Sequence, residues 1–236
     1  MVFLDKPHIK QFTDIFDTSI KNLFICKIYF YYYLISSYNL YIHYLTYTNI
    51  NVNKLFSSGW FLIINMLIAI LSFIIIYQNY HIYPTNKISN TIFSLTFSNT
   101  VIVFLTNIFS NLFLLSLELI TNIILLSIVI YTLVYKSENF NKIKFIYVLF
   151  PIYLIAVFLI EYLEMLTNRQ LVYLLIFSFG FLSLHLQNIK IIVKRYMQND
   201  FYLAYLNLYF IFIDTINIIL LDIIIEIFFP KRKYKK

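Results

Sequence analysis

The chain has 236 residues, of which 61% are hydrophobic and only 12% are charged, and its mean hydropathy is +0.79. These values exclude an ordinary soluble domain and predict an all-α, polytopic membrane protein embedded in a lipid bilayer. The net charge is +7, but nothing beyond basic residues resembles a nucleic-acid-binding domain, so we expect no nucleic-acid partner.

Long apolar segments follow a polar N-terminal region, residues 1–22, which we expect to be cytosolic. A helix needs about 20 apolar residues to cross the bilayer core. The sequence therefore predicts a single transmembrane domain over 23–229, followed by a basic cytosolic tail at 230–236. It has six or seven helices, at about 23–45, 56–78, 91–110, 112–134, 145–160, 171–193 and 201–229.

Basic residues between the segments predict the orientation, because cytosolic loops are enriched in Lys and Arg. With a cytosolic N-terminus, the outside loops receive only Lys54 and Arg169. The cytosolic side then receives Lys6, Lys10, Lys21, Lys87, Lys136, Lys142, Lys144, Lys190, Lys194 and Arg195.

The last apolar stretch, 201–229, leaves two alternatives open. Seven full crossings place the tail KRKYKK outside, against the charge rule, whereas a re-entrant segment turning near 214–217 keeps it cytosolic. Irregular backbone at that depth is tolerated only where protein buries it or water reaches it. On the cytosolic side, the tail would bind anionic lipid.

Carboxylates within apolar segments are the first candidates for an ion pathway, because a charge at mid-membrane costs about 2.5 kcal/mol or more. Asp214 lies near the centre of the last stretch, and Asp222 falls about 80° around from it on a continuous helix. Glu226 extends this stripe, although pairing with the basic tail is the simpler interpretation. Glu118 is a second intramembrane acid, in the segment 112–134.

Four short stretches, in order along the chain, resemble the transmembrane Bax inhibitor motif family, also called Lifeguard. IKNLFICKIY at 20–29 is similar to the family's "VR..FIRKVY", and YPTNKI at 83–88 resembles "YPxNyi". SENF at 137–140 stands where members carry an Asp-Phe pair. AYLNLY and IDTIN, at 204–209 and 213–217, resemble an interrupted "AALNLYLDIIN".

The resemblance implies a six- or seven-helix protein of the endoplasmic reticulum or Golgi, associated with calcium leak and restraint of cell death. The family's leak is attributed to two facing aspartates, of which Asp214 matches one. HLQNI at 185–189 aligns with the "DTQ" of the other, so that His185 replaces its aspartate, and Asn99 stands where members carry a glutamate.

Two function hypotheses follow. The first is a Bax-inhibitor-like protein that leaks calcium or another cation, with Asp214, His185, Asp222 and Glu118 along the pathway. The alternative is a non-conducting scaffold that binds other membrane proteins. We expect no enzyme activity and no cofactor, because the sequence has no recognised catalytic or nucleotide-binding motif and a single cysteine, Cys26.

Overall fold

The computed structural model describes residues 18–79, 85–106, 109–135, 141–162, 166–195, and positions 201, 204, 205 and 208. Within these residues all regular structure is helical, which confirms the predicted all-α class. The helices are α1 Thr18–Thr48, α2 Ile50–Phe56, α3 Gly59–Asn79, α4 Thr85–Thr106, α5 Asn111–Val134, α6 Lys142–Tyr162 and α7 Asn168–Arg195.

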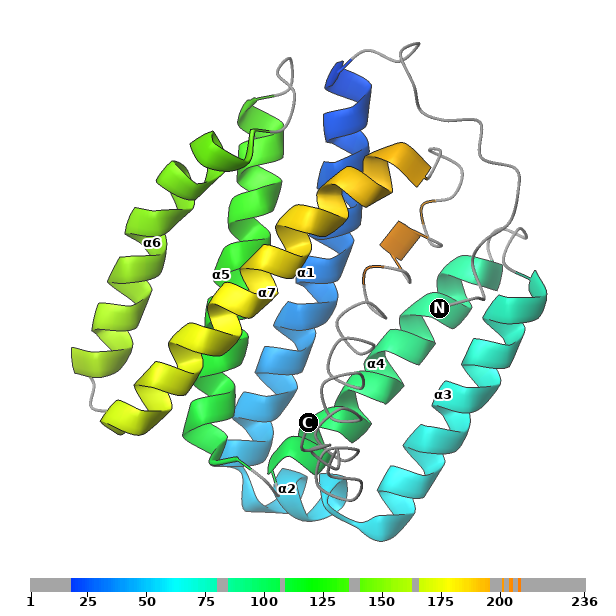
Figure 1. The fold of residues 1–236 in the computed structure, drawn as a ribbon. Coiled ribbons are helices and arrows are strands. Elements are labelled where there is room, and N and C mark those ends of the chain that lie inside the picture. Colours follow the sequence, from blue (N-terminus) through cyan, green and yellow to red (C-terminus); the bar gives the residue numbers. More distant parts are fainter. Residues whose placement is uncertain are drawn as a thin grey trace, which may run out of the picture.

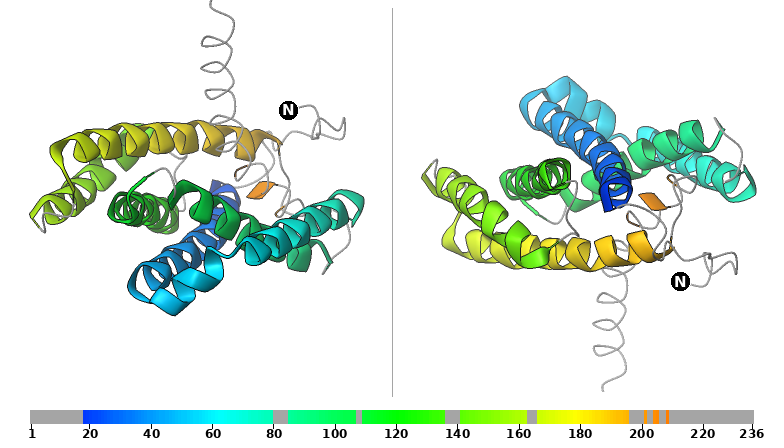
Figure 2. Two further views of the ribbon diagram at one scale, coloured as in Figure 1. Left: turned by 90° about the horizontal axis from the view of Figure 1, so that it is seen from below. Right: turned by 90° about the horizontal axis from the view of Figure 1, so that it is seen from above.

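Six long helices run up and down a bundle, and the short α2 closes its lower end (Figure 1). The helices α1 and α5 lie at the centre, with the pair α3 and α4 on one side and α6 and α7 on the other (Figure 2). The most extensive helix contacts are α1 with α5 and α3 with α4. The helix α1 also packs against α4 and α7, so it contacts one helix of each outer pair.

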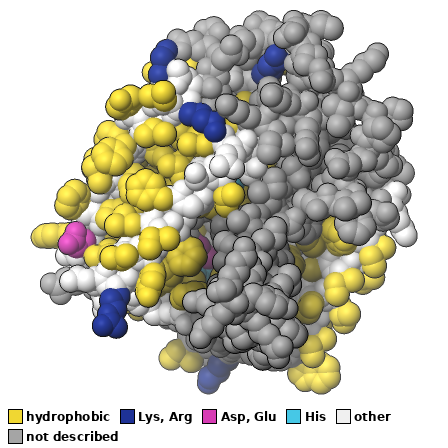
Figure 3. Space-filling model, viewed as in Figure 1, with side chains coloured by type: hydrophobic (Ala, Val, Ile, Leu, Met, Phe, Trp, Pro, Cys, Tyr) yellow, Lys and Arg dark blue, Asp and Glu magenta, His cyan; other side chains and the backbone are white. Residues whose placement is uncertain are grey.

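Four of these helices are long and apolar enough to cross a membrane: α3, α5, α6 and α7. The coarse prediction of an integral membrane protein is therefore supported, while the number of spans stays a prediction. In α3 and α6 most side chains point away from the bundle, and apolar side chains gather on the left of Figure 3, among the described residues. Such a surface is suited to contact with lipid.

Polar residues set where several helices begin. Asn49 accepts hydrogen bonds from the backbone N–H groups of Asn51 and Val52, and Ser110 accepts one from that of Phe113. At α7, Thr167 and Gln170 bond each other's backbone N–H groups, which is a capping box. These side chains satisfy N–H groups that the first turn of a helix leaves unpaired.

Three features differ from the prediction. The segment 46–55, expected to be a polar turn, contains α2, because Asn49 caps a new helix there. The helix α4 begins at Thr85 although a loop was expected up to residue 90, and Ser89 and Asn90 are already buried in the bundle. The first helix also begins earlier than predicted, at Thr18 instead of residue 23.

Because the long helices run up and down the bundle, labelling at its two ends can test how the protein is oriented in the membrane. Lys54 lies on α2 and Lys87 near the start of α4; both are exposed, and they belong to opposite ends of the bundle. Single cysteines at these positions, in a Cys26→Ser background, should react with an impermeant thiol reagent from opposite sides of the membrane. We expect Lys87→Cys to label from the cytosol. Labelling of both from one side would contradict the bundle's topology.

A second prediction concerns the contact between α1 and α5. Leu125 is fully buried on α5, whereas its neighbour Leu126 is 37% exposed. Leu125→Ala leaves a cavity and should lower the free energy of unfolding by on the order of 2 kcal/mol. Thermal unfolding in detergent measures the effect, with Leu126→Ala as the matched control. Equal losses in the two variants would mean that this face of α5 is not packed.

Candidate functional site

Four polar residues along α1 recur every seven positions and are all buried: Asn22, Tyr29, Ser36 and His43. Seven residues fall only about 20° from two complete turns, so these side chains share one face. We call this row the polar seam of α1. Polar groups inside a membrane bundle need internal partners, because lipid supplies none. His43 and Tyr29 have partners on α5 and α7, and Asn22 has one directly after α5.

At its lower end, the seam forms a contact between a histidine and an acid. His43 Nδ1 lies 3.2 Å from Glu118 Oε2 on α5. The side chain of His43 is fully buried, and that of Glu118 is 21% exposed. The other ring nitrogen, His43 Nε2, is buried and has no hydrogen-bond partner. We call this pair the His43–Glu118 dyad.

Further hydrogen bonds extend from the dyad along α5. Asn122 donates from Nδ2 to the backbone carbonyl of Glu118 at 2.9 Å, and its Oδ1 accepts from the hydroxyl of Ser37 at 3.0 Å. The amide of Asn122 therefore connects the backbone beside the acid to α1. At the upper end of the seam, Asn22 donates from Nδ2 to the carbonyl of Tyr135, just after α5.

Half-way up the bundle, Tyr29 meets His185 of α7. The hydroxyl of Tyr29 donates to the backbone carbonyl of His185 at 3.2 Å and lies 3.3 Å from its Nδ1. The imidazole is 2% exposed and lies among the rings of Phe181, Tyr29 and Tyr32, with centroid separations of 4.0, 5.5 and 5.7 Å. His185 therefore sits in an aromatic enclosure.

Aromatic contacts continue from this enclosure towards α4. The ring of Tyr205 contacts those of Tyr31 and Tyr32, and its hydroxyl donates to Ser94 on α4 at 2.9 Å. Tyr31 is also hydrogen-bonded to Thr91 on α4, at 2.6 Å. The Tyr-rich run 29–34 thus links α1 to both α7 and α4.

The structure does not unite the predicted site residues that it describes. Glu118 pairs with His43 and His185 with Tyr29, and these two contacts are 14 positions, or about 20 Å, apart along α1. Asn99 is buried on α4, and its Oδ1 has no hydrogen-bond partner. Asp214 and Asp222 lie outside the described residues, so their predicted roles stay predictions.

Sequence reasoning missed His43 as a site residue. It falls at the end of the predicted segment 23–45, where a histidine resembles an ordinary boundary residue. The signal that could have found it is the seven-residue spacing of polar side chains from Asn22 to His43. Among the described residues, no three His, Cys, Asp or Glu side chains form a group that could hold a metal ion.

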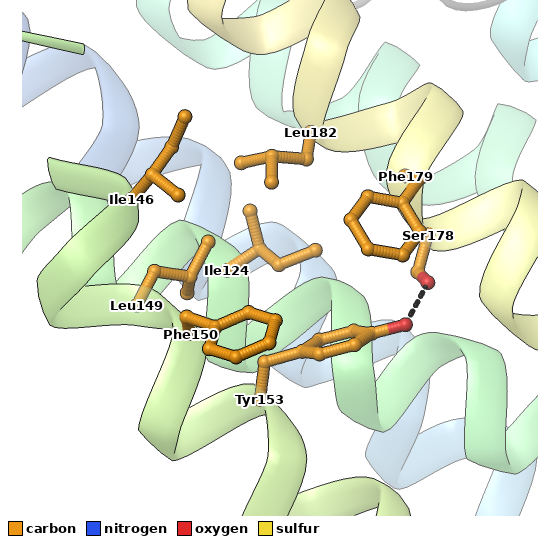
Figure 4. A pocket seen from close by; sticks show the side chains of 8 residues that line it. All are labelled: Ile124, Ile146, Leu149, Phe150, Tyr153, Ser178, Phe179 and Leu182. Carbon is orange, nitrogen blue, oxygen red and sulfur yellow. Dashed lines mark hydrogen bonds between the residues drawn. The ribbon is translucent and has the colours of Figure 1, made fainter. Parts of the chain in front are cut away.

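A separate small pocket lies between α5, α6 and α7 (Figure 4). Its one polar feature is the hydrogen bond between the hydroxyls of Tyr153 and Ser178, at 2.6 Å. The other side chains around it are apolar: Ile124, Ile146, Leu149, Phe150, Phe179 and Leu182. The pocket offers a surface for hydrocarbon and no charged group.

No family model, curated protein or solved structure matches this chain. The resemblance to the Bax inhibitor motif family therefore rests on the sequence stretches given above, and the site has to be interpreted from its own chemistry.

The enclosure of His185 generates a prediction. Tyr29→Phe removes the hydroxyl that bonds His185 and leaves buried polar atoms unpaired, which should destabilise the protein by about 1–3 kcal/mol. Tyr33→Phe is the matched control, because Tyr33 is only partly buried and its ring stacks on Phe30. Thermal unfolding in detergent compares the two. A Tyr29→Phe variant as stable as the control would mean that this hydrogen bond contributes nothing.

Proposed function

We propose that this chain is a Bax-inhibitor-like protein of an intracellular membrane, the endoplasmic reticulum or Golgi, that leaks calcium or another cation and restrains cell death. The order of four family-like stretches along the chain supports the family. The polar seam inside the bundle supports an ion-related role.

The observation on which the ion-related role chiefly rests is Glu118. It is an acid within the apolar helix α5, partly exposed, and held by a fully buried histidine. Ionisable side chains inside membrane segments are rare, and they usually line ion paths or water-filled cavities. A purely structural polar contact between α1 and α5 could be made by neutral amides, as Ser37 and Asn122 make one here.

The enclosure of His185 favours a second function, the non-conducting scaffold. The family resemblance assigns His185 to the position of a leak aspartate. The imidazole is nevertheless surrounded by aromatic rings and bonded to Tyr29. Such packing stabilises a helix junction and leaves little room for a hydrated ion. A scaffold would use its exposed apolar helices to bind other membrane proteins.

Flux measurements in proteoliposomes distinguish the two functions. Asp214→Asn and Glu118→Gln each remove a negative charge and keep the size of the side chain. If the protein conducts cations, either variant should reduce release of calcium or a monovalent cation at matched protein load. Removing a charge from mid-membrane lowers the cost of insertion by about 2.5–3.5 kcal/mol, so Asp214→Asn should fold at least as well as the parent.

Glu161→Gln serves as the control, because Glu161 is an exposed acid near the end of α6. Asp214→Glu should retain part of the flux because it keeps the charge. Unchanged flux in both test variants, together with reduced thermal stability, would reject the leak and leave the scaffold.

A further inference from the structure

We propose that the His43–Glu118 dyad is a proton-binding site within the bundle, with His43 Nε2 as the atom that takes up the proton. No part of the family resemblance assigns a role to either residue. Whether the dyad binds a proton is independent of whether the protein conducts cations.

We take the starting state of the dyad to be an ionised Glu118 beside a neutral His43. An ionised carboxylate can only accept hydrogen bonds, so Nδ1 of His43 must carry a proton and donate it to Glu118 Oε2 across 3.2 Å. In a neutral imidazole with its proton on Nδ1, the other nitrogen has a free lone pair. That nitrogen is Nε2, which is buried and has no hydrogen-bond partner. The dyad is thus a base whose Nε2 atom can accept a proton.

Proton uptake at this atom is chemically balanced. A hydronium ion transfers a proton to the lone pair of Nε2, and a water molecule leaves. The neutral ring becomes an imidazolium, and its hydrogen bond to Glu118 becomes an ion pair, so the dyad changes from a net charge of −1 to 0. The neutral pair suits an apolar interior better than a lone carboxylate does. Loss of the same proton to water reverses the step.

The position of the dyad provides access to solvent. His43 lies five residues before the end of α1 at Thr48, and Glu118 lies seven residues after the start of α5 at Asn111. Both are therefore about 10 Å or less from the lower end of the bundle. Glu118 is partly exposed whereas the ring of His43 is fully buried, so solvent reaches the dyad on the side of the acid and the proton has to pass from there to Nε2.

Other ionisable groups on the packed helices differ in position from the dyad. Lys54 on α2 and Arg169 on α7 are exposed at the lower end, and Lys87 on α4 is exposed at the opposite end. His185 of α7 is bonded to Tyr29, further up the seam. These helices also carry the exposed tyrosines of α1 near the dyad, Tyr41, Tyr44 and Tyr47, together with Lys21 and Lys27 towards the start of α1, Tyr131 of α5 and Tyr173 of α7.

Nuclear magnetic resonance of the full chain with ¹⁵N-labelled histidine, in detergent micelles, tests the proposal directly. The sequence has four histidines, and His43→Gln identifies the signal of His43. Above neutral pH we expect a single tautomer with the proton on Nδ1. On acidification the ring should gain its second proton, at Nε2.

Two variants separate a proton site from a merely structural contact. Glu118→Gln keeps a side chain of similar size but removes the charge. We expect the preference for the tautomer with the proton on Nδ1 to be lost. Glu161→Gln, an exposed acid at the same end of the bundle, should leave this preference unchanged.

Two results would overturn the proposal. One is a wild-type His43 ring that stays neutral throughout the range from pH 8 to 5, which needs no variant to be folded. The other is a His43 ring that keeps the same tautomer in the wild type and in Glu118→Gln. Neither result depends on flux, so the proton site and the proposed leak can fail separately.

Discussion

The need to pair polar groups inside an apolar bundle governs this structure. The helix α1 contributes a row of polar side chains, and hydrocarbon cannot hydrogen-bond any of them. Three contacts hold α1 to α5 at different heights: Asn22 with Tyr135, Ser37 with Asn122, and His43 with Glu118. As the residue number rises along α1 it falls along α5, so these bonds fix the register of an antiparallel pair. The other helices pack around that pair.

Large side chains make up the rest of the core. The two glycines, Gly59 and Gly180, have no neighbouring atom within 4 Å of where a Cβ would stand, so neither allows two helices to approach closely. The largest fully buried side chains are instead Tyr29, Tyr131, Tyr205, Phe145 and a series of isoleucines and leucines. Bulky side chains keep the helices apart, and polar bonds such as Tyr153 with Ser178 then supply specificity at the junctions.

The sequence predicted where the long helices lie better than it predicted which side chains contact each other. Hydropathy located α3, α5, α6 and α7 to within a few positions, because each must present apolar side chains to lipid or core. It missed α2, although Asn49 is a typical capping residue. Glu118 was recognised as an intramembrane acid, but its partner depends on the register of two helices far apart in the chain. His185 was found by resemblance, whereas its aromatic enclosure depends on side chains from α1. Asp214 and Asp222 lie outside the described residues.

The dependence of α1 on later helices has a consequence for biogenesis. A membrane protein is synthesised from its N-terminus, so α1 leaves the ribosome well before α5 and α7 exist. Its polar seam has no partner at that stage. The helix α1 is also not among the four helices that are long and apolar enough to cross a membrane. We therefore expect α1 to remain beside the insertion machinery until Glu118, Asn122 and finally His185 have been translated. The synthesis of α5 and α7 would then allow α1 to enter the bilayer.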